Sequence, residues 1–502
     1  MSKPRLRFSP SPTGYLHIGS LRTVLFTYFI ARNLGGDLIL RIEDTDQKRE
    51  VEDATERLID VIKKFKIDFD EGPLMGGDFG PYIQSQRLEI YNKYALELLA
   101  KGEAYHCFCT PERLEKMRAD QQAAKLPPRY DRLCRELTAL DVKKIIDAGE
   151  KFVIRQKMPL SGEVKVHDEL RGDIVFQARD LEDHVLVKSN GMPTYQFAVV
   201  VDDHLMQITH VTRADEWIPS FPKNILLYQS FGWDAPKFIH FPVIMNKAGG
   251  KLSKRQGDVA VEDFLSNGYL PDAIINFCAL LGWHPKTDNE ILSRQEIIRN
   301  FNYHDIGTSP AIFDNDKLDY FNGYYIRHLD IDKLIELCLP YLQIIKNNNI
   351  ISSPNFQFPI SPHSGTRNFQ SNSFIKKVIA LEQERLKKLS DIAELTGFFF
   401  ALPEFDASLL VWKNMQLSAV KMNLEKIIEL LEKIPDDSWT NKSIEEALMS
   451  YIKIKELKTG EYLWPMRASL CGQKASPGPF DIAQVLGKAE TLKRLKYSID
   501  KL

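Results

Sequence analysis

The sequence predicts an α/β fold in the first half of the chain and an almost wholly helical second half. Segments typical of strands and of helices alternate over residues 1–104 and again over 191–254, and such alternation favours a parallel sheet covered by helices. A strand-rich stretch between these ranges interrupts the alternation. With 502 residues the chain is too long for one compact core, so we expect several domains.

The first elements follow one another closely along the chain. Residues 5–10, RLRFSP, are typical of a strand, and residues 18–34 are typical of a helix that two glycines end. A second strand is predicted at 37–44, DLILRIED. Apolar residues at helical spacing then predict helices over 53–65 and 87–103.

Residues 105–190 look like an insertion with a small fold of its own. FVIRQKMPLSGEVKVHDELRGDIVF, residues 152–176, is rich in strand signals. Strand and helix signals resume at TYQFAVVVDD and continue to KFIHFPVIM. One sheet interrupted by an insertion explains this order better than two unrelated domains.

The second half carries helical periodicity almost throughout, as in KLIELCLPYLQIIK and LEKIIELLEKI. Ser443 followed by Glu446 matches the pattern of a capping box at a helix start. Residues 345–373 are rich in Asn, Ser and Pro, and we expect a flexible linker or loop there, with no chemistry of its own.

Composition and charge bound the class of protein. The 66 Lys and Arg and 68 Asp and Glu leave a formal net charge of −2, so total charge gives no hint of nucleic acid, although a neutral total can hide a basic face. Six cysteines without a secretion signal make no disulfide scaffold. No apolar run approaches ~18 residues, and we expect a cytoplasmic protein that does not enter a membrane.

The stretch RFSPSPTGYLHIGSLRTVLF places a turn between the first strand and the first helix. A helix N-terminus offers unpaired N–H groups and the positive end of the helix dipole, so it attracts phosphate. Gly14 and Gly19 would let a ligand approach the backbone, Pro12 would stiffen the turn, and His17 can donate to a phosphate oxygen. Taken alone, these residues fit an ordinary tight turn with a surface histidine better.

Residues 249–257, GGKLSKRQG, form a second stretch with two interpretations. It is either a solvated basic loop or a mobile loop whose Lys251 and Lys254 neutralise charge on a departing pyrophosphate. Two familiar phosphate motifs are missing: no G-x-G-x-x-G follows the first strand, and Lys251 lacks the following Ser or Thr of a P-loop.

HIGS and KLSKR together resemble the HIGH and KMSKS signature of class I aminoacyl-tRNA synthetases. More narrowly, the chain resembles bacterial glutamyl-tRNA synthetases in the order and spacing of SPSPTGYLHIGSLRT, LRIEDTD, GPYIQSQR, PTYQFAVVVDDHLM, THVTRADEW and GYLPDAIINF. The resemblance covers nearly the whole chain and is weakest at 345–373.

This resemblance implies a domain order. A Rossmann-type catalytic domain would occupy residues 1–104 and 191–254, and its second half would carry the KLSKR loop. An α+β domain that binds the acceptor end of tRNA would be inserted at 105–190. A stem-contact domain at 255–325 and an all-helical anticodon-binding region at 326–502 would follow.

The resemblance also implies a two-step reaction. Glutamate and ATP, with Mg²⁺, form glutamyl-adenylate, and the glutamyl group then passes to the 3′-terminal adenosine of tRNA-Glu. Neither step needs a protein nucleophile, so catalysis rests on positioning and charge stabilisation. Whether tRNA-Gln is charged as well stays open, and such charging would require a partner amidotransferase. Similarity further implies a monomer.

Roles carry over only to positions that match the family's motifs. Those expected to act in catalysis are His17 and Lys254. Those expected to bind ATP are Pro12, Gly14, His17, Gly19, Lys251, Ser253, Lys254 and Arg255. Those expected to bind glutamate are Arg7, Ser9, Ser11, Glu43, Tyr195 and Arg213. Arg213 is assigned to the side-chain carboxylate and Glu43 to the α-amine, since arginine forks match carboxylates.

Three cysteines match a zinc site found in some members of the family. Cys107, Cys109 and Cys134 have the spacing C-x-C-x24-C, and the fourth position holds Glu136. Either Glu136 or Tyr130 would complete a tetrahedron around a structural Zn²⁺. The alternative is that zinc has been lost and the cysteines have no metal.

Direct signs of an RNA partner are modest, and the helical second half also fits a plain appendage or a dimerisation unit. Similarity makes it the anticodon-binding region. Within it, Arg385 aligns with a position where an arginine recognises the third anticodon base in some members.

Three other functions compete with this one. A glutaminyl-tRNA synthetase would carry a second half rich in β-barrels, whereas this one is helical. The truncated paralogue that attaches glutamate to a modified tRNA base lacks the anticodon region. A catalytically inactive RNA-binding scaffold would have no use for a pyrophosphate loop.

Overall fold

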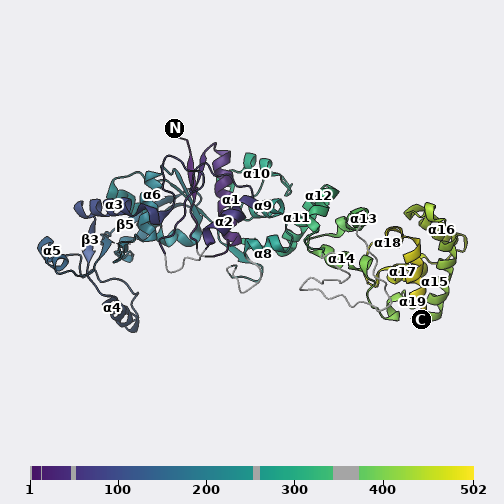
Figure 1. Cartoon of the computed structure of the whole chain (residues 1–502). Coiled ribbons are helices and arrows are strands. Elements are labelled where there is room, and N and C mark those ends of the chain that lie inside the picture. Colours follow the sequence, from purple (N-terminus) through teal and green to yellow (C-terminus); the bar gives the residue numbers. More distant parts are fainter. Residues whose placement is uncertain (1–2, 13, 47–52, 251, 253–259, 343–371) are drawn as a thin grey trace. The chain divides into compact units, whose positions relative to one another are not determined.

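The computed structural model describes residues 3–12, 14–46, 53–250, 252, 260–342 and 372–502 (Figure 1). They fall into two compact units, the first made of Met1–Ser266 and Pro271–Asn315, the second of Asn267–Leu270 and Asp316–Leu502. Part of the predicted site lies outside the described residues: Lys251, Ser253, Lys254 and Arg255. The predicted linker at 345–373, apart from its last two residues, lies outside them as well.

Six strands form the central sheet of the first unit, in the spatial order β2–β1–β8–β9–β5–β6. Neighbouring strands pair in parallel except β6, which runs antiparallel to β5. Their bounds are β1 Arg5–Phe8, β2 Asp37–Leu40, β5 Glu163–Asp168, β6 Gly172–Gln177, β8 His210–Ala214 and β9 Lys237–Phe241. The predicted α/β class with a mainly parallel sheet is confirmed. The β5–β6 hairpin joins this sheet, although its residues belong to the stretch 105–190 that the sequence marks as an insertion.

A smaller antiparallel sheet lies in the same unit, in the order β3–β4–β7. Its strands are β3 Ala104–Cys107, β4 Val153–Gln156 and β7 Val185–Val187. Two further strands pair in parallel, β10 Ile244–Asn246 and β11 Ala311–Phe313. β3 therefore delivers Cys107, the first of the predicted zinc ligands, at its carboxyl end.

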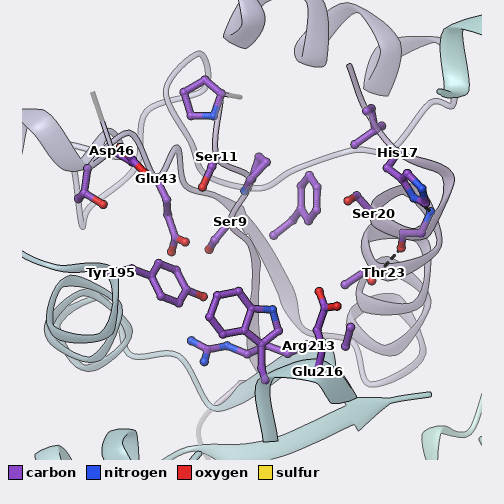
Figure 2. A pocket seen from close by; sticks show the side chains of 18 of the residues that line it. Ser9, Ser11, His17, Ser20, Thr23, Glu43, Asp46, Tyr195, Arg213 and Glu216 are labelled. Atoms are coloured by element: carbon purple, nitrogen blue, oxygen red, sulfur yellow. Dashed lines mark hydrogen bonds between the residues drawn. The ribbon is translucent and has the colours of Figure 1, made fainter. Parts of the chain in front are cut away.

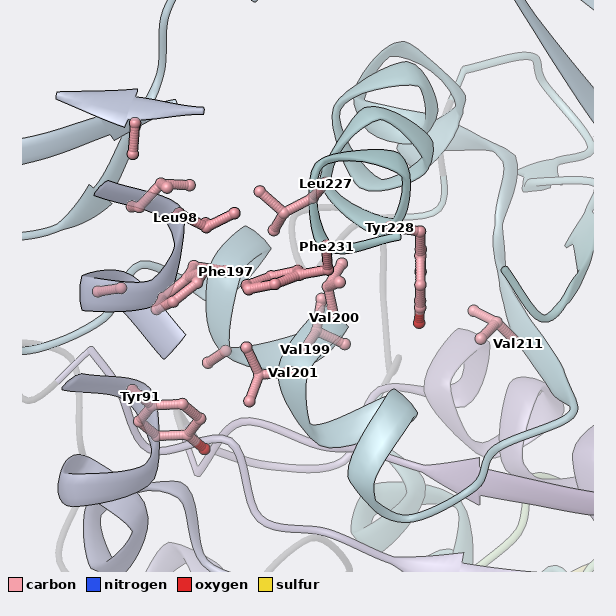
Figure 3. Packing of buried hydrophobic residues seen from close by; sticks show 14 of the residues in the cluster. Tyr91, Leu98, Phe197, Val199, Val200, Val201, Val211, Leu227, Tyr228 and Phe231 are labelled. Atoms are coloured by element: carbon pink, nitrogen blue, oxygen red, sulfur yellow. The ribbon is translucent and has the colours of Figure 1, made fainter. Parts of the chain in front are cut away.

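Helix α1, Ile18–Asn33, begins directly behind β1 and is buried on most sides, at Leu21, Val24, Leu25 and Phe26 among others. Such all-round burial is typical of a helix enclosed by other elements, and α1 packs against β1, α9 and α10. Helices α3, α6 and α7 contribute to a hydrophobic core around Phe197, Leu227 and Phe231 (Figure 3). The helices of this unit are α2 Ala54–Lys64, α3 Leu88–Ala100, α4 Pro111–Ala123, α5 Ala139–Asp147, α6 Tyr195–Leu205, α7 Phe221–Phe231, α8 Val261–Ser266, α9 Pro271–Ala279 and α10 Arg294–Asn300.

The described part of the second unit is almost wholly helical, as predicted. Its helices are α11 Asn315–Arg327, which starts at the boundary, α12 Ile331–Cys338, α13 Asn372–Glu382, α14 Asp391–Phe400, α15 Leu417–Glu432, α16 Asn441–Ile454, α17 Thr459–Cys471, α18 Pro479–Leu486 and α19 Lys488–Asp500. Leu424, Ile427 and Ile444 lie in its core. Among the described residues of both units, no helix combines the length and apolarity needed to cross a bilayer.

The capping box of α16 differs from the predicted one. Thr440, not Ser443, is the N-cap: Ser443 N donates to Thr440 Oγ1 at 3.2 Å, and Thr440 N donates back to Ser443 Oγ at 3.0 Å. The S-x-x-E pattern was wrong here because Ser443 is itself the fourth residue, at position N3, of a box that starts with threonine.

Candidate active site

A pocket of about 1010 Å³ opens where β1 and β8 end. The carboxyl ends of parallel strands are the usual ligand-binding edge of open α/β sheets. All of the described residues predicted to bind ATP or glutamate line it: Arg7, Ser9, Ser11, Pro12, Gly14, His17, Gly19, Glu43, Tyr195 and Arg213. The structure thus brings together residues that are far apart in sequence.

The turn before α1 forms one wall of this pocket (Figure 2). His17 is the N-cap of α1, and its Nδ1 accepts a hydrogen bond from Gly19 N at 2.9 Å. Because Nδ1 is the acceptor, the ring proton of a neutral His17 lies on Nε2, which is the atom able to donate. A Cβ at position 19 would lie 3.1 Å from His17 Nδ1, so Gly19 leaves room for this cap.

The described residues next to the predicted pyrophosphate loop lie at the pocket or beside its wall. Leu252 lines the pocket. On the other side of 253–259, Ala260 forms a β-bridge with His17, and Val261 N donates to Leu16 O at 2.9 Å. Leu252 therefore lies at the pocket, and Ala260 and Val261 lie beside the turn that precedes α1.

A second wall carries the residues predicted to bind glutamate. Figure 2 shows Ser9, Glu43, Tyr195 and Arg213 around one common space, with Ser11 farther along the same segment as Ser9. Ser9 Oγ is buried and has no hydrogen-bond partner among the described residues. Burial raises the pKa of Tyr195, which keeps its hydroxyl protonated and able to donate.

Arg213 carries a buried positive charge toward this space. The residue is only 6% exposed, and its Nη1 donates to Asn224 Oδ1 at 3.3 Å. Its Nε is buried without a partner, and no carboxylate in the described part of the chain forms an ion pair with it. A buried guanidinium without an anion is costly, so this geometry fits an anionic ligand.

Two arginines and two carboxylates form a buried network at the wall of the pocket, which Arg7 and Glu43 line. Arg7 donates from Nε to Asp203 Oδ1 at 3.0 Å and from Nη2 to Asp203 Oδ2 at 3.3 Å. Arg41 donates from Nη1 to Asp203 Oδ1 at 2.8 Å and from Nη2 to Glu43 Oε1 at 3.0 Å. All four residues are buried.

Burial and these pairings shift the pKa values of the two carboxyl groups in opposite directions. Burial raises the pKa of Glu43 despite the nearby Arg41 and Arg7. Burial also disfavours the Asp203 carboxylate, but the guanidinium groups of Arg7 and Arg41 outweigh it and hold the pKa of Asp203 below its usual range. A cation placed beside Glu43 would favour its ionised form.

Sequence reasoning missed Arg41, Asp203 and His184. Arg41 and Asp203 stand within the quoted motifs LRIEDTD and VVVDDHLM, and a charge inside an apolar strand or helix was the available signal. His184 lines the pocket, has no partner for either ring nitrogen among the described residues, and is held neutral because burial lowers its pKa to about 3.

The cysteine cluster lies in the smaller sheet and its neighbouring loop. The Sγ atoms of Cys107, Cys109 and Cys134 all lie within 4.8 Å of one another. The hydroxyl of Tyr130 lies 3.2 Å from Cys107 Sγ and 3.5 Å from Cys109 Sγ. The side chain of Glu136 is 84% exposed and faces Arg135 instead, so the structure brings Tyr130, not Glu136, to the three thiols.

Arg385 lies in the second unit, directly after α13. Its Nη1 donates to Glu382 Oε2 at 2.6 Å, and about a third of its side chain is exposed. Glu382 is fully buried, and burial raises its pKa to about 7 against the opposing effect of Arg385.

Comparison with family models gives matches over most of the chain. The model for tRNA synthetases class I (E and Q), catalytic domain, matches residues 3–320. The model for an anticodon binding domain matches residues 333–499. Together they cover both structural units.

Curated relatives and solved structures agree with these matches. A glutamate–tRNA ligase of Clostridium botulinum is 44% identical over 503 residues, covering 100% of this chain and 99% of the relative. One from Clostridium tetani is 45% identical, covering 100% and 98%. The crystal structure of a glutamate tRNA ligase from Elizabethkingia meningosepticum in complex with its amino acid superposes with a TM-score of 0.87 at 34% identity, covering 100% of both chains. A glutamate-tRNA synthetase from Elizabethkingia anophelis gives the same TM-score and identity, covering 99% of this chain and 100% of that one.

Proposed function

The chain belongs to the glutamate–tRNA ligases of class I, which join glutamate to tRNA at the expense of ATP, and from this premise we propose how its residues divide the work. The single observation that carries the proposal is Arg213, a buried guanidinium without an anionic partner in the described part of the chain, at the wall of the pocket.

Arg213 would bind the side-chain carboxylate of glutamate, with the Tyr195 hydroxyl beside it. Glu43 would accept from the α-ammonium, and Arg7 would donate to the α-carboxylate, with Ser9 and Ser11 close by. Glutamine would leave the charge of Arg213 unpaired in a buried site. A site built to pair a group can reject an analogue that lacks it by roughly 10⁴, so this pocket needs no separate editing step against glutamine.

ATP would lie along the turn before α1. Pro12, Gly14 and Gly19 shape a surface that a phosphate can approach closely, and His17 Nε2 can donate to a phosphate oxygen. Lys251, Ser253, Lys254 and Arg255 keep the role that the resemblance gives them, with Lys254 neutralising charge on the pyrophosphate. Mg²⁺ would accompany the ATP phosphates, since it is usually held by phosphates and water rather than by a protein cage.

The chemistry then follows from positioning. A carboxylate oxygen of glutamate attacks the α-phosphorus of ATP and expels pyrophosphate. A ribose hydroxyl of the tRNA end next attacks the activated carbonyl carbon and expels AMP. The protein supplies no nucleophile. Its contribution is to hold the reacting groups in line and to stabilise the charge on the departing pyrophosphate.

Zinc is the second part of the proposal. Three thiols and the Tyr130 hydroxyl converge closely enough for one ion, and sulfur with one oxygen is a donor set that Zn²⁺ accepts. Cys107, Cys109, Cys134 and Tyr130 would hold it, with a structural role, because the set is already complete at four. The Arg155 guanidinium lies 3.9 Å from the centre of the Tyr130 ring and would keep that ring in place.

The remaining proposals concern RNA and assembly. Residues 105–190 would hold the acceptor end, 255–325 would contact the stem, and Arg385 would recognise an anticodon base from the region 326–502. The enzyme would act as a monomer in the cytoplasm. A partner amidotransferase would be required only if tRNA-Gln is charged too.

Aminoacylation with labelled glutamate, assayed separately on purified tRNA-Glu and tRNA-Gln, tests the substrate range. Charging of tRNA-Glu alone would support Arg385 as an anticodon reader. Charging of both would extend the activity to tRNA-Gln and would count against an anticodon contact that discriminates between them.

A further inference from the structure

Asp203 joins the two ends of the network beneath the pocket. Asp203 belongs to α6, which is far from β1 and β2 along the sequence. Its two carboxylate oxygens nevertheless accept hydrogen bonds from Arg7 and Arg41 at 2.8–3.3 Å. Arg7 also donates from Nη1 to Thr212 O at 3.3 Å. A guanidinium has five N–H donors, so three are used and two remain for a ligand.

Arg41 passes the same constraint on to Glu43. It is fully buried, and its Nε and Nη2 both donate to Glu43 Oε1, at 3.3 and 3.0 Å. Glu43 Oε2 accepts no hydrogen bond within the described residues. One oxygen of Glu43 is therefore anchored while the other is left at the pocket that Glu43 lines.

We propose that Asp203 and Arg41 are positioning residues for the amino-acid end of the substrate. Asp203 orients Arg7 directly and orients Glu43 through Arg41. This inference rests on the roles proposed above for Arg7 and Glu43. Neither positioning residue would touch glutamate. Each would instead fix the orientation in which its charged neighbour, Arg7 or Glu43, meets glutamate. Such preorganisation sets how much each contact contributes to the free energy of binding.

The charge balance supports this division of work. Arg7 and Arg41 carry two positive charges, and Glu43 and Asp203 carry two negative ones, so the four groups cancel. Replacing Asp203 by a neutral residue would leave one positive charge of the network unpaired and free Arg7 to turn.

A purely structural ion pair is the competing explanation, and the chain offers a matched control for it. Asp202 is the adjacent residue on α6 and is also fully buried. It accepts from Arg87 Nε at 2.8 Å, Gln84 Nε2 at 2.9 Å and the Tyr91 hydroxyl at 2.8 Å. None of these three residues lines the pocket. Its longer ion pair with Arg41, at 3.8 Å, makes it a stringent control.

The experiment compares glutamate with two truncated analogues as competitors in tRNA aminoacylation by the full chain. Glutarate lacks the α-amine, and 4-aminobutyrate lacks the α-carboxylate. For each variant, the ratio of the inhibition constant of an analogue to the KM of glutamate measures how much the missing group contributes. The variants are Asp203→Asn, Arg41→Gln, Glu43→Gln and the control Asp202→Asn.

We expect Arg41→Gln to lower the glutarate ratio about tenfold or more, and Asp203→Asn to lower both ratios, as coupled neighbours do. Asp203→Glu should restore part of the effect. Asp202→Asn should lower the melting temperature and leave both ratios within about twofold. If Asp203→Asn fails to fold, the Arg41→Gln ratios decide alone.

Two outcomes separate the inference from its premise. If Glu43→Gln leaves the glutarate ratio unchanged, the role of Glu43 itself is wrong. If Glu43→Gln lowers that ratio while Arg41→Gln and Asp203→Asn behave like Asp202→Asn, the role of Glu43 stands and the positioning role is overturned.

Discussion

The guanidinium carbon of Arg213 lies 5.4 Å from the ring centre of Tyr195, and both residues line the pocket. Trp217 approaches the same guanidinium at 5.6 Å. Aromatic faces stabilise a cation in a site that water cannot easily reach, so the positive charge is tolerated there without a carboxylate of the protein. The guanidinium of Arg213 can still form a stronger ion pair with the carboxylate of an anionic substrate.

Arg213→Gln should therefore lower kcat/KM for glutamate by about 10²–10³, because losing one partner of a buried charge pair costs several kcal/mol. The loss should appear in aminoacylation of tRNA at saturating ATP, with KM for ATP little changed. Arg32→Gln is the matched control, since Arg32 pairs with Asp70 at a partly exposed site away from the pocket. A loss of less than threefold for Arg213→Gln would exclude it as the main contact of the side-chain carboxylate.

Most residues that line this pocket could be predicted from sequence motifs, whereas the buried residues that hold them in place could not. Arg7 and Arg213 are the second-last residues of neighbouring parallel strands, and the carboxyl ends of such strands meet at one edge. The contact of Asp203 with Arg7 and Arg41 depends instead on where α6 lies relative to β1 and to the residue that follows β2. Nothing in a sequence pattern of period 3.6 or 2 says which buried charge meets which across such a gap.

The same limit explains other differences between sequence and structure. The β5–β6 hairpin has a strand pattern, but only its parallel bridge from Asp168 to Phe238 shows that it joins the main sheet. Glu136 occupies the fourth position of the cysteine motif, whereas the loop that carries Tyr130 folds back over the thiols. Sequence spacing gives the candidates for a fourth ligand, and the loop's path decides which one is near.

Zinc binding gives a prediction that distinguishes Tyr130 from Glu136. The purified protein should hold zinc in equimolar amount, measured by elemental analysis, and Cys109→Ser should lose it. Tyr130→Phe should weaken binding about tenfold or more in a chelator competition, as loss of a metal-site partner does. Glu136→Gln should bind zinc like the wild type. If Tyr130→Phe kept its zinc and Glu136→Gln lost it, the fourth ligand would be Glu136 and not Tyr130.

Substitution with Co²⁺ adds a readout that is independent of activity. Thiolate ligands should give a sulfur-to-metal charge-transfer band, and its intensity should fall in each cysteine variant. A band unchanged in Cys134→Ser would remove Cys134 from the ligand set.

Glu382 predicts a pH dependence of stability. Its pKa is raised from 4.5 to about 7 by burial, so between these values the folded chain holds a proton that the unfolded chain has released. Each rise in pH across this window therefore lowers the free energy of unfolding, and above about pH 7 the loss is complete. Glu382→Gln removes the effect, so its stability relative to the wild type should be greater at pH 8 than at pH 5, by at most about 3 kcal/mol.

Melting temperatures of the full chain between pH 5 and pH 8 check this. The exposed neighbour Glu384 is the control, and Glu384→Gln should follow the wild-type profile. Parallel profiles for Glu382→Gln and the wild type would contradict a raised pKa at this site.

His17 combines two roles that one substitution can separate. Its Nδ1 caps α1 through Gly19 N, and its Nε2 is the nitrogen proposed to donate to ATP. Asparagine is among the best N-cap residues, so His17→Asn should keep the cap. Its shorter side chain places no donor at the position of Nε2, because the amide N–H groups lie closer to the backbone. We expect little change in melting temperature and a fall of about 10²–10³ in the rate of glutamyl-adenylate formation, the usual effect of losing one donor to developing charge. His17→Ala should show the same loss of rate and, in addition, about 1 kcal/mol of lost stability from the missing cap.

Adenylate formation is followed by exchange of labelled pyrophosphate into ATP in the presence of tRNA. Wild-type exchange by His17→Asn would mean that His17 serves the helix and not the reaction.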